Sequence, residues 1–127
     1  MTTSTHTPPA IITEAEARQW AVGERDASVR SVTRLRGALV QGLGFGEDAE
    51  ALAATLHELA AAEGYRNLFA QVVAILDRGH TTDDVVEQVQ RSVTLGADDQ
   101  WSGRTNNVRR ARFDGTLRAA AAVFGAL

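Results

Sequence analysis

Apolar residues along this chain recur at spacings of three and four, which is the period of an α-helix. The clearest run lies between Ser28 and Leu43, and its apolar positions are Val29, Val32, Leu35, Leu39, Val40 and Leu43. The three arginines of this run, at positions 30, 34 and 36, fall off that apolar face. No stretch of useful length shows the alternation of a strand. The pattern therefore predicts an all-α fold.

A capping box marks the start of the first predicted helix. Thr13 is followed three residues later by Glu16, which is the arrangement in which each side chain satisfies backbone donors at a helix start. We expect a short helix from Glu14 to Val22 that stops at Gly23, with Trp20 as its apolar anchor.

Glycines and capping residues also divide the middle of the chain. Asp48 is expected to cap a helix that ends before Gly64. The next helix, over residues 68–76, is apolar over more than half its surface, so we expect it to lie centrally. Gly79 fits a helix C-cap, because glycine adopts the left-handed conformation that such caps use.

Two more helices are expected in the last third of the chain. The threonines at 81–82 can begin one of them, and residues 96–103 then read as a loop. A last helix begins near Thr105, and Gly115 is a point at which it can kink or break. Together these patterns predict a single-domain bundle of five or six helices over residues 12–127. Residues 1–11 are rich in Thr, Ser and Pro, and we expect a disordered tail there.

Composition places the chain among ordinary globular proteins. Its 127 residues fit one domain, and 44% of them are hydrophobic. It contains no cysteine, which excludes disulfides, thiolate nucleophiles and cysteine-ligated metal sites. No apolar run reaches the length of a membrane span, and the first residues lack the basic and apolar regions of a secretory signal. We therefore expect a cytoplasmic protein.

Two segments carry a resemblance to a known family. RLRGALVQGLG (Arg34–Gly44) and AILDRGHTTDDVVEQV (Ala74–Val89) resemble a small actinobacterial family of unknown function. In that family a helix containing GAL precedes a W/L-D-x-x-x-x-T-x-x-D/E-V segment. Here Ile75–Leu76–Asp77 replaces the usual Trp-Asn-Asp. The resemblance implies a helical, actinobacterial protein and no assigned activity.

The charges of the chain are unusual in kind and in distribution. All thirteen cations are arginines, which excludes a Walker lysine and Schiff-base chemistry. A GC-rich genome is the favoured explanation for the missing lysine, and selection against lysine modification is the alternative. Residues 41–99 carry a net charge of −8, whereas residues 100–127 carry +4. An acidic middle and a basic end fit either a charged partner or pairing within the chain.

Several motifs that carry chemistry are incomplete. GLGFG, at residues 42–46, lacks the third glycine of a dinucleotide loop, because Glu47 follows it. The carboxylates that follow would also repel a phosphate at the start of the next helix. His57 and Glu58 do not form H-E-x-x-H, because residue 61 is alanine. We expect no catalytic residue and no cofactor.

One cluster contains residues that can ligate metal. Asp77, His80, Asp83 and Asp84 lie close together in sequence and could hold a divalent ion. The segment has no second histidine and lacks the spacing of an EF-hand. A helix end, a turn and an acidic helix start explain these residues more simply, so we expect no metal site.

The strongest candidate for binding is an arginine-rich stretch near the C-terminus. We predict that partner binding uses Trp101, Arg104, Asn107, Arg109, Arg110 and Arg112. Arginine and tryptophan are enriched at binding hot spots. Three interpretations stay open, namely pairing with the acidic middle of the chain, binding of a protein partner, and contact with nucleic-acid phosphates.

We therefore expect a small cytoplasmic helical adaptor or regulator that acts by protein–protein interaction. The alternative is a nucleic-acid-binding regulator that uses the arginine-rich helix over residues 104–118. The acidic middle of the chain opposes the alternative, since it repels a polyanion at long range. The alanine-rich segment at 119–122 can be core or the seam of a homo-oligomer.

Overall fold

A computed structural model describes residues 13–101, without the Trp101 side chain, and residues 106–127. These residues form four α-helices and no strand: α1 (Glu14–Gly44), α2 (Ala49–Asp77), α3 (Thr82–Trp101) and α4 (Asn107–Ala126). The all-α prediction is confirmed, but the predicted count of five or six helices is wrong. The tail predicted over residues 1–11 lies outside the described part of the chain.

The count differs because α1 continues through Gly23, where a helix end was predicted. Buried residues keep helical spacing on both sides of this glycine, with Ala17 and Ala21 before it and Val32 and Leu35 after it. An added Cβ at Gly23 would meet nothing within 4 Å, so the glycine lies on the outer face. A glycine inside a helix costs about 1 kcal/mol relative to alanine, which the packing of the continuous apolar face offsets.

Two predicted helices are likewise one helix in α2, which continues through Gly64. This glycine is buried, and an added Cβ would overlap the backbone carbonyl of Arg112 on α4. Gly64 is therefore a contact point between two helices rather than a helix end. Gly96 and Gly115 behave like Gly64, because Gly96 lies inside α3 against the ring of Phe113 and Gly115 lies inside α4. The loop predicted from residue 96 is thus helical up to residue 101.

The helix starts predicted at the capping residues Thr13 and Asp48 are confirmed, whereas residues 28 and 68, where helices were also predicted to begin, lie inside α1 and α2. The Thr13 hydroxyl accepts a hydrogen bond from the Glu16 amide at 3.1 Å, as the capping box requires. Asp48 caps α2 by accepting from the Ala51 amide at 2.9 Å. Gly79, just after α2, has a φ of +86°, the left-handed conformation expected of a helix-terminating glycine.

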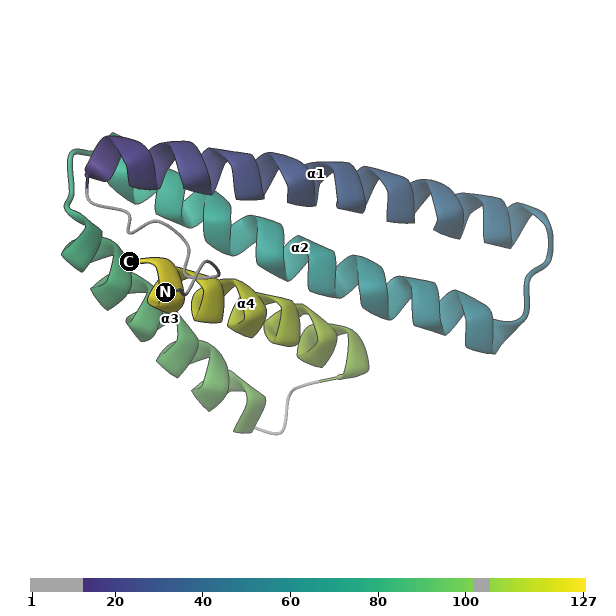
Figure 1. The fold of residues 1–127 in the computed structure, drawn as a ribbon. Coiled ribbons are helices and arrows are strands. Elements are labelled where there is room, and N and C mark those ends of the chain that lie inside the picture. Colours follow the sequence, from purple (N-terminus) through teal and green to yellow (C-terminus); the bar gives the residue numbers. More distant parts are fainter. Residues whose placement is uncertain (1–12, 102–105) are drawn as a thin grey trace, which may run out of the picture.

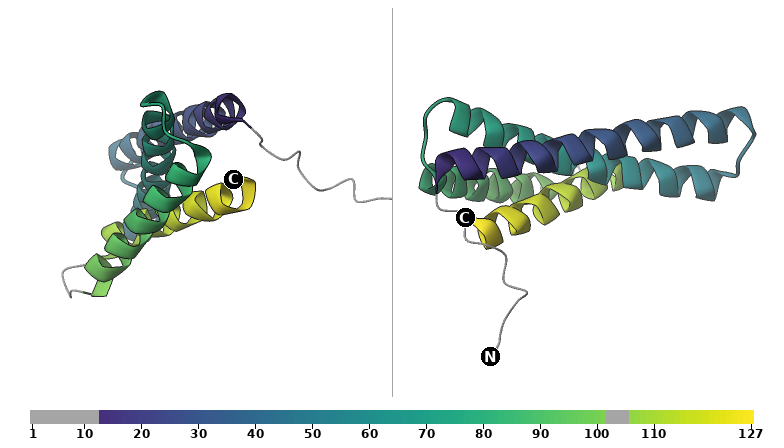
Figure 2. Two further views of the ribbon diagram at one scale, coloured as in Figure 1. Left: turned by 90° about the vertical axis from the view of Figure 1, so that its left-hand side faces the viewer. Right: turned by 45° about the horizontal axis from the view of Figure 1, so that its top comes forward.

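The four helices are arranged around α2. α1 and α2 form a long antiparallel hairpin, and α4 lies along the opposite side of α2 (Figure 1). α3 packs against α4 and α2 at the end of the hairpin where α1 begins. The other end of the hairpin extends beyond α3 and α4, as both Figure 1 and the right-hand view of Figure 2 show. No helix within residues 13–101 and 106–127 is long and apolar enough to cross a membrane.

The core consists of two clusters along α2. The larger one joins all four helices, and its largest fully buried side chains include Phe69, Val72, Ile75, Val85 and Val123. The expectation that residues 68–76 lie centrally is thereby confirmed. The smaller cluster lies farther along the hairpin and is built from Val32, Leu35 and Leu59 of α1 and α2 alone.

The spacing between α2 and α4 is set by Gly64 of α2 and Gly115 of α4, each of which faces the backbone of the other helix. An added Cβ at Gly115 would overlap the backbone carbonyl of Ala61 on α2, just as one at Gly64 would overlap that of Arg112. Backbone atoms cannot move aside as a flexible side chain can. The two helices therefore approach at a distance that only glycine permits at these positions.

We expect Gly115→Ala to destabilise the protein by about 2 kcal/mol, because the added methyl group must push α4 away from α2. Gly37→Ala is the matched control, since Gly37 lies inside α1 with open space around its Cα. This control should stabilise the protein by roughly 0.5–1 kcal/mol through helix propensity. Urea unfolding followed by circular dichroism measures both changes. Equal effects of the two substitutions would contradict the close approach of α2 and α4.

Candidate functional site

The structure describes the side chains of four of the six predicted partner-binding residues. Arg104 lies outside the described residues, and Trp101 is the last residue of α3, with its side chain not described. Asn107, Arg109, Arg110 and Arg112 lie in the first two turns of α4 and are all exposed. The Asn106 side chain caps this helix by accepting a hydrogen bond from the Arg109 amide at 2.9 Å, and this bond fixes where the helix starts.

These four residues do not form one patch. Asn107 and Arg110 line a groove between α4 and the first half of α2. Arg109 and Arg112 line a different groove, which α4 forms with the end of α3. The division follows from the helix period, because Arg110 is rotated by about 100° from Arg109.

Arg112 has a partner in the acidic middle of the chain. Its guanidinium lies 3.6 Å from a carboxylate oxygen of Glu63, and the other oxygen of Glu63 lies 3.1 Å from Arg36. Glu63 thus joins α1, α2 and α4 through one carboxylate whose side chain is 19% exposed. For Arg112, pairing within the chain is the arrangement that the structure shows.

The groove that contains Asn107 and Arg110 adjoins a second one. Each has a volume of about 360 Å³, and both are lined by Glu58, Ala61 and Arg118. We call the two together the furrow. Its lining residues from the two grooves are Glu24, Ala27, Ser28, Ser31, Arg34, Leu35, His57, Glu58, Ala61, Ala62, Tyr65, Asn107, Arg110, Ala111, Asp114, Gly115 and Arg118.

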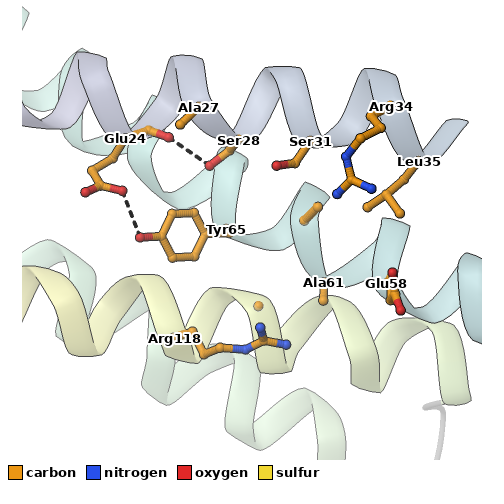
Figure 3. A pocket seen from close by; sticks show the side chains of 12 residues that line it. Glu24, Ala27, Ser28, Ser31, Arg34, Leu35, Glu58, Ala61, Tyr65 and Arg118 are labelled. Atoms are coloured by element: carbon orange, nitrogen blue, oxygen red, sulfur yellow. Dashed lines mark hydrogen bonds between the residues drawn. The ribbon is translucent and has the colours of Figure 1, made fainter. Parts of the chain in front are cut away.

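Charged side chains reach the furrow from both of its sides. Figure 3 shows Arg34 entering from α1 and Arg118 from α4, with Glu58 of α2 beside them. Small residues, among them Ala61 and Gly115, line the space between these charges. The close contact of α2 and α4 at these residues therefore also shapes the furrow.

Most of these charges are unpaired. Arg34, Arg110 and Arg118 form no ion pair with any residue in the described part of the chain. The carboxylates of Glu58 and Asp114 likewise have no cationic partner among residues 13–101 and 106–127. A guanidinium offers five donors in a planar fork that matches a carboxylate or a phosphate. The furrow thus presents both guanidinium groups and carboxylates on one surface.

Tyr65 lies at one end of the furrow, where a hydrogen bond and a ring contact hold its side chain in place. Its hydroxyl donates a hydrogen bond of 3.0 Å to the Glu24 carboxylate, and its ring packs against Phe69 with centroids 5.0 Å apart. Burial, together with the hydrogen bond to the Glu24 carboxylate and its negative charge, raises the pKa of Tyr65 to about 12. Ser28 donates to the backbone carbonyl of Glu24 at 2.8 Å, which orders the same turn of α1.

The candidate metal ligands have other partners. Asp77 pairs with Arg18 at 2.5 Å, joining the end of α2 to the start of α1, and this hydrogen bond lowers the pKa of Asp77. Asp84 accepts a hydrogen bond from the Thr81 amide at the start of α3, and this bond lowers the pKa of Asp84. His80 lies 3.4 Å from Asp84. In the described part of the chain, no three histidines or carboxylates gather in a metal-binding arrangement.

Of the residues that line the furrow, only Asn107 and Arg110 were predicted from the sequence to bind a partner. Arg34 and Arg118 are 84 positions apart, and no motif links them. The helix pattern did place Arg34 off the apolar face of α1. It could not show which neighbour that position would meet, because this depends on how α4 lies against α2.

Comparison of the chain with protein-family models, with curated proteins and with solved structures gave no match.

We expect the tyrosine of the native protein to titrate near pH 12, and that of the urea-unfolded chain near pH 10. Tyr65 is the only tyrosine, so absorbance at 295 nm reports it alone. Because the folded state holds this proton more tightly, stability should be unaffected below about pH 10 and fall as the pH rises toward 12. Glu24→Gln should lower the native midpoint. A native midpoint equal to the unfolded one would contradict the burial and hydrogen bonding of Tyr65.

Proposed function

We propose that this chain is a small cytoplasmic helical adaptor that binds a charged segment of another protein in the furrow. The observation that carries the proposal is the set of unpaired charges of both signs that line one concave surface. Kinship with the actinobacterial family of unknown function would leave the proposal unchanged, because that resemblance implies no activity.

The mixture of charges favours a protein over a nucleic acid. Arg34, Arg110 and Arg118 would attract phosphates, but Glu58 and Asp114 line the same furrow and would repel them. A protein segment can carry carboxylates toward the arginines and cations toward the acids. Complementary charges of this kind set register and specificity at protein interfaces.

The location of the furrow also fits a binding role. Alanines and a glycine line it together with the charged residues, so a partner's backbone or a small side chain can approach closely. The helices α1, α2 and α4 supply its walls and are held together by the buried cores beside them. A rigid surface loses little conformational entropy when it binds.

Arg110→Ala combined with Arg118→Ala should weaken partner capture at least tenfold, because two charged hydrogen-bond donors leave the furrow. The readout is the amount of a specific protein retained from a lysate of the source organism, identified by mass spectrometry. Both residues are exposed and unpaired within the described residues, so the thermal midpoint should stay within about 2 °C of the unsubstituted protein.

The matched control is Arg78→Ala combined with Arg91→Ala. It removes the same charge from exposed positions outside the furrow, at the end of α2 and on α3. Capture should persist in this control. Equal capture by all three proteins would contradict the role of the furrow.

A gel shift with a 30-base-pair duplex at low salt tests the nucleic-acid alternative. We expect no retardation, because the furrow holds acids and the chain has a net charge of −3. Retardation that the Arg110/Arg118 variant abolishes would overturn the proposal in favour of nucleic-acid binding.

A further inference from the structure

The face of α4 that borders the furrow carries charges of alternating sign. Arg110, Asp114 and Arg118 follow one another at intervals of four residues, are exposed, and line the same groove. Since an α-helix rises by about 1.5 Å per residue, these charges succeed one another at about 6 Å along α4. We call these three residues the charge stripe. In chain order it reads positive, negative, positive.

The charges of the stripe do not neutralise one another. Residues four apart on a helix can form an ion pair, and α3 shows one such pair, in which Arg91 lies 3.2 Å from Glu87. Asp114 has the same spacing to an arginine on each side, yet the stripe forms no ion pair with any residue that the structure describes. Its guanidinium groups and its carboxylate are therefore open to groups from outside the chain.

The α2 side of the furrow strengthens this pattern at its negative position. Glu58 of α2 lines the same groove as the stripe, and the Arg118 side chain extends from α4 toward Ala61 and Glu58 (Figure 3). A cation that reaches Asp114 thus enters a groove that holds two carboxylates. The complementary partner carries an anion, a cation and an anion at steps of about 6 Å.

A helix meets this requirement better than an extended segment does. Every fourth residue of a helix lies on nearly the same face and about 6 Å farther along, so three contacts can stay in register with α4. The walls of the furrow are helices, whose backbone amides and carbonyls already bond to each other. An extended segment would lose water from its own backbone groups without gaining partners there, whereas a helix bonds its own. Ala61, Ala111 and Gly115 also let a helix approach closely.

We propose that the furrow binds a helix of the partner protein on which an acid, a base and an acid recur at every fourth residue. The inference rests on the proposed function and adds the form and the charge order of the bound segment. The two acids lie against Arg110 and Arg118, and the base lies against Asp114. A like charge at any of the three positions is repelled, so the order of charges selects the partner.

Fluorescence anisotropy with labelled alanine-based peptides of about 20 residues tests the proposal at low salt. The first peptide carries Glu, Lys and Glu at every fourth residue. The matched control carries the same residues at every fifth position, which spreads them around the helix in steps of about 140° at equal composition and net charge. We expect the first peptide to bind at least fivefold more tightly, because only it can present all three charges to the stripe together. Equal affinities would overturn the proposal.

A variant with the stripe reversed provides the reciprocal test. Arg110→Glu, Asp114→Arg and Arg118→Glu combined should prefer a peptide with Lys, Glu and Lys at every fourth residue, whereas the unsubstituted chain should prefer the Glu, Lys and Glu peptide. Circular dichroism should show the same helix content in both chains, as all three positions are exposed. An unchanged preference in the folded variant would contradict pairing with the stripe.

A third peptide separates a helix from an extended segment. It contains Glu-Pro-Lys-Pro-Glu, in which the prolines prevent a helix but keep the charge order. Binding as tight as that of the helical peptide would overturn the helical form. If no peptide binds at up to 1 mM of the chain, the proposed helix is wrong, while partner capture that depends on Arg110 and Arg118 would still support the adaptor function. Loss of that dependence would overturn the adaptor function itself.

Discussion

The close approach of α2 and α4 at Gly64 and Gly115 is the constraint on which the rest of the structure depends. Each glycine faces a backbone carbonyl of the other helix, so neither position has room for a side chain. This contact brings α4 alongside α2, opposite α1. It thereby lets one carboxylate, that of Glu63, reach arginines on both neighbouring helices.

The same constraint explains why the molecule has two kinds of surface. Where α4 covers α2, small residues at the contact leave a furrow lined by unpaired charges from three helices. Beyond the first turn of α4, the hairpin has no third helix and exposes apolar side chains instead. The charged furrow and the exposed apolar end of the hairpin are therefore chemically different surfaces.

The errors in the predicted helix count have one physical source. Glycine weakens a helix by an amount that tertiary packing easily exceeds, so Gly23 and Gly64 were wrongly read as helix ends. Gly79 was read correctly, because there the chain turns in a left-handed conformation. The three cases look alike in sequence. Beyond Gly23 and Gly64 the buried residues continue at helical spacing, whereas at Gly79 the helix ends. For Gly23 this continuation is clear only once the packing of α1 against α2 is known.

The sequence by itself determined the helical class, the starts of α1, α2 and α3, and the outward position of the arginines at 30, 34 and 36, because these depend on local spacing and on side chains that bond to nearby amides. It also determined that residues 68–76 lie in the core, since an element apolar over most of its surface must be covered. Only the tertiary structure decided which charges meet. Arg110 and Arg118 line one furrow with Arg34, while Arg112 pairs with Glu63, because the rotation and level of α4 against α2 are set by contacts between residues about 50 positions apart.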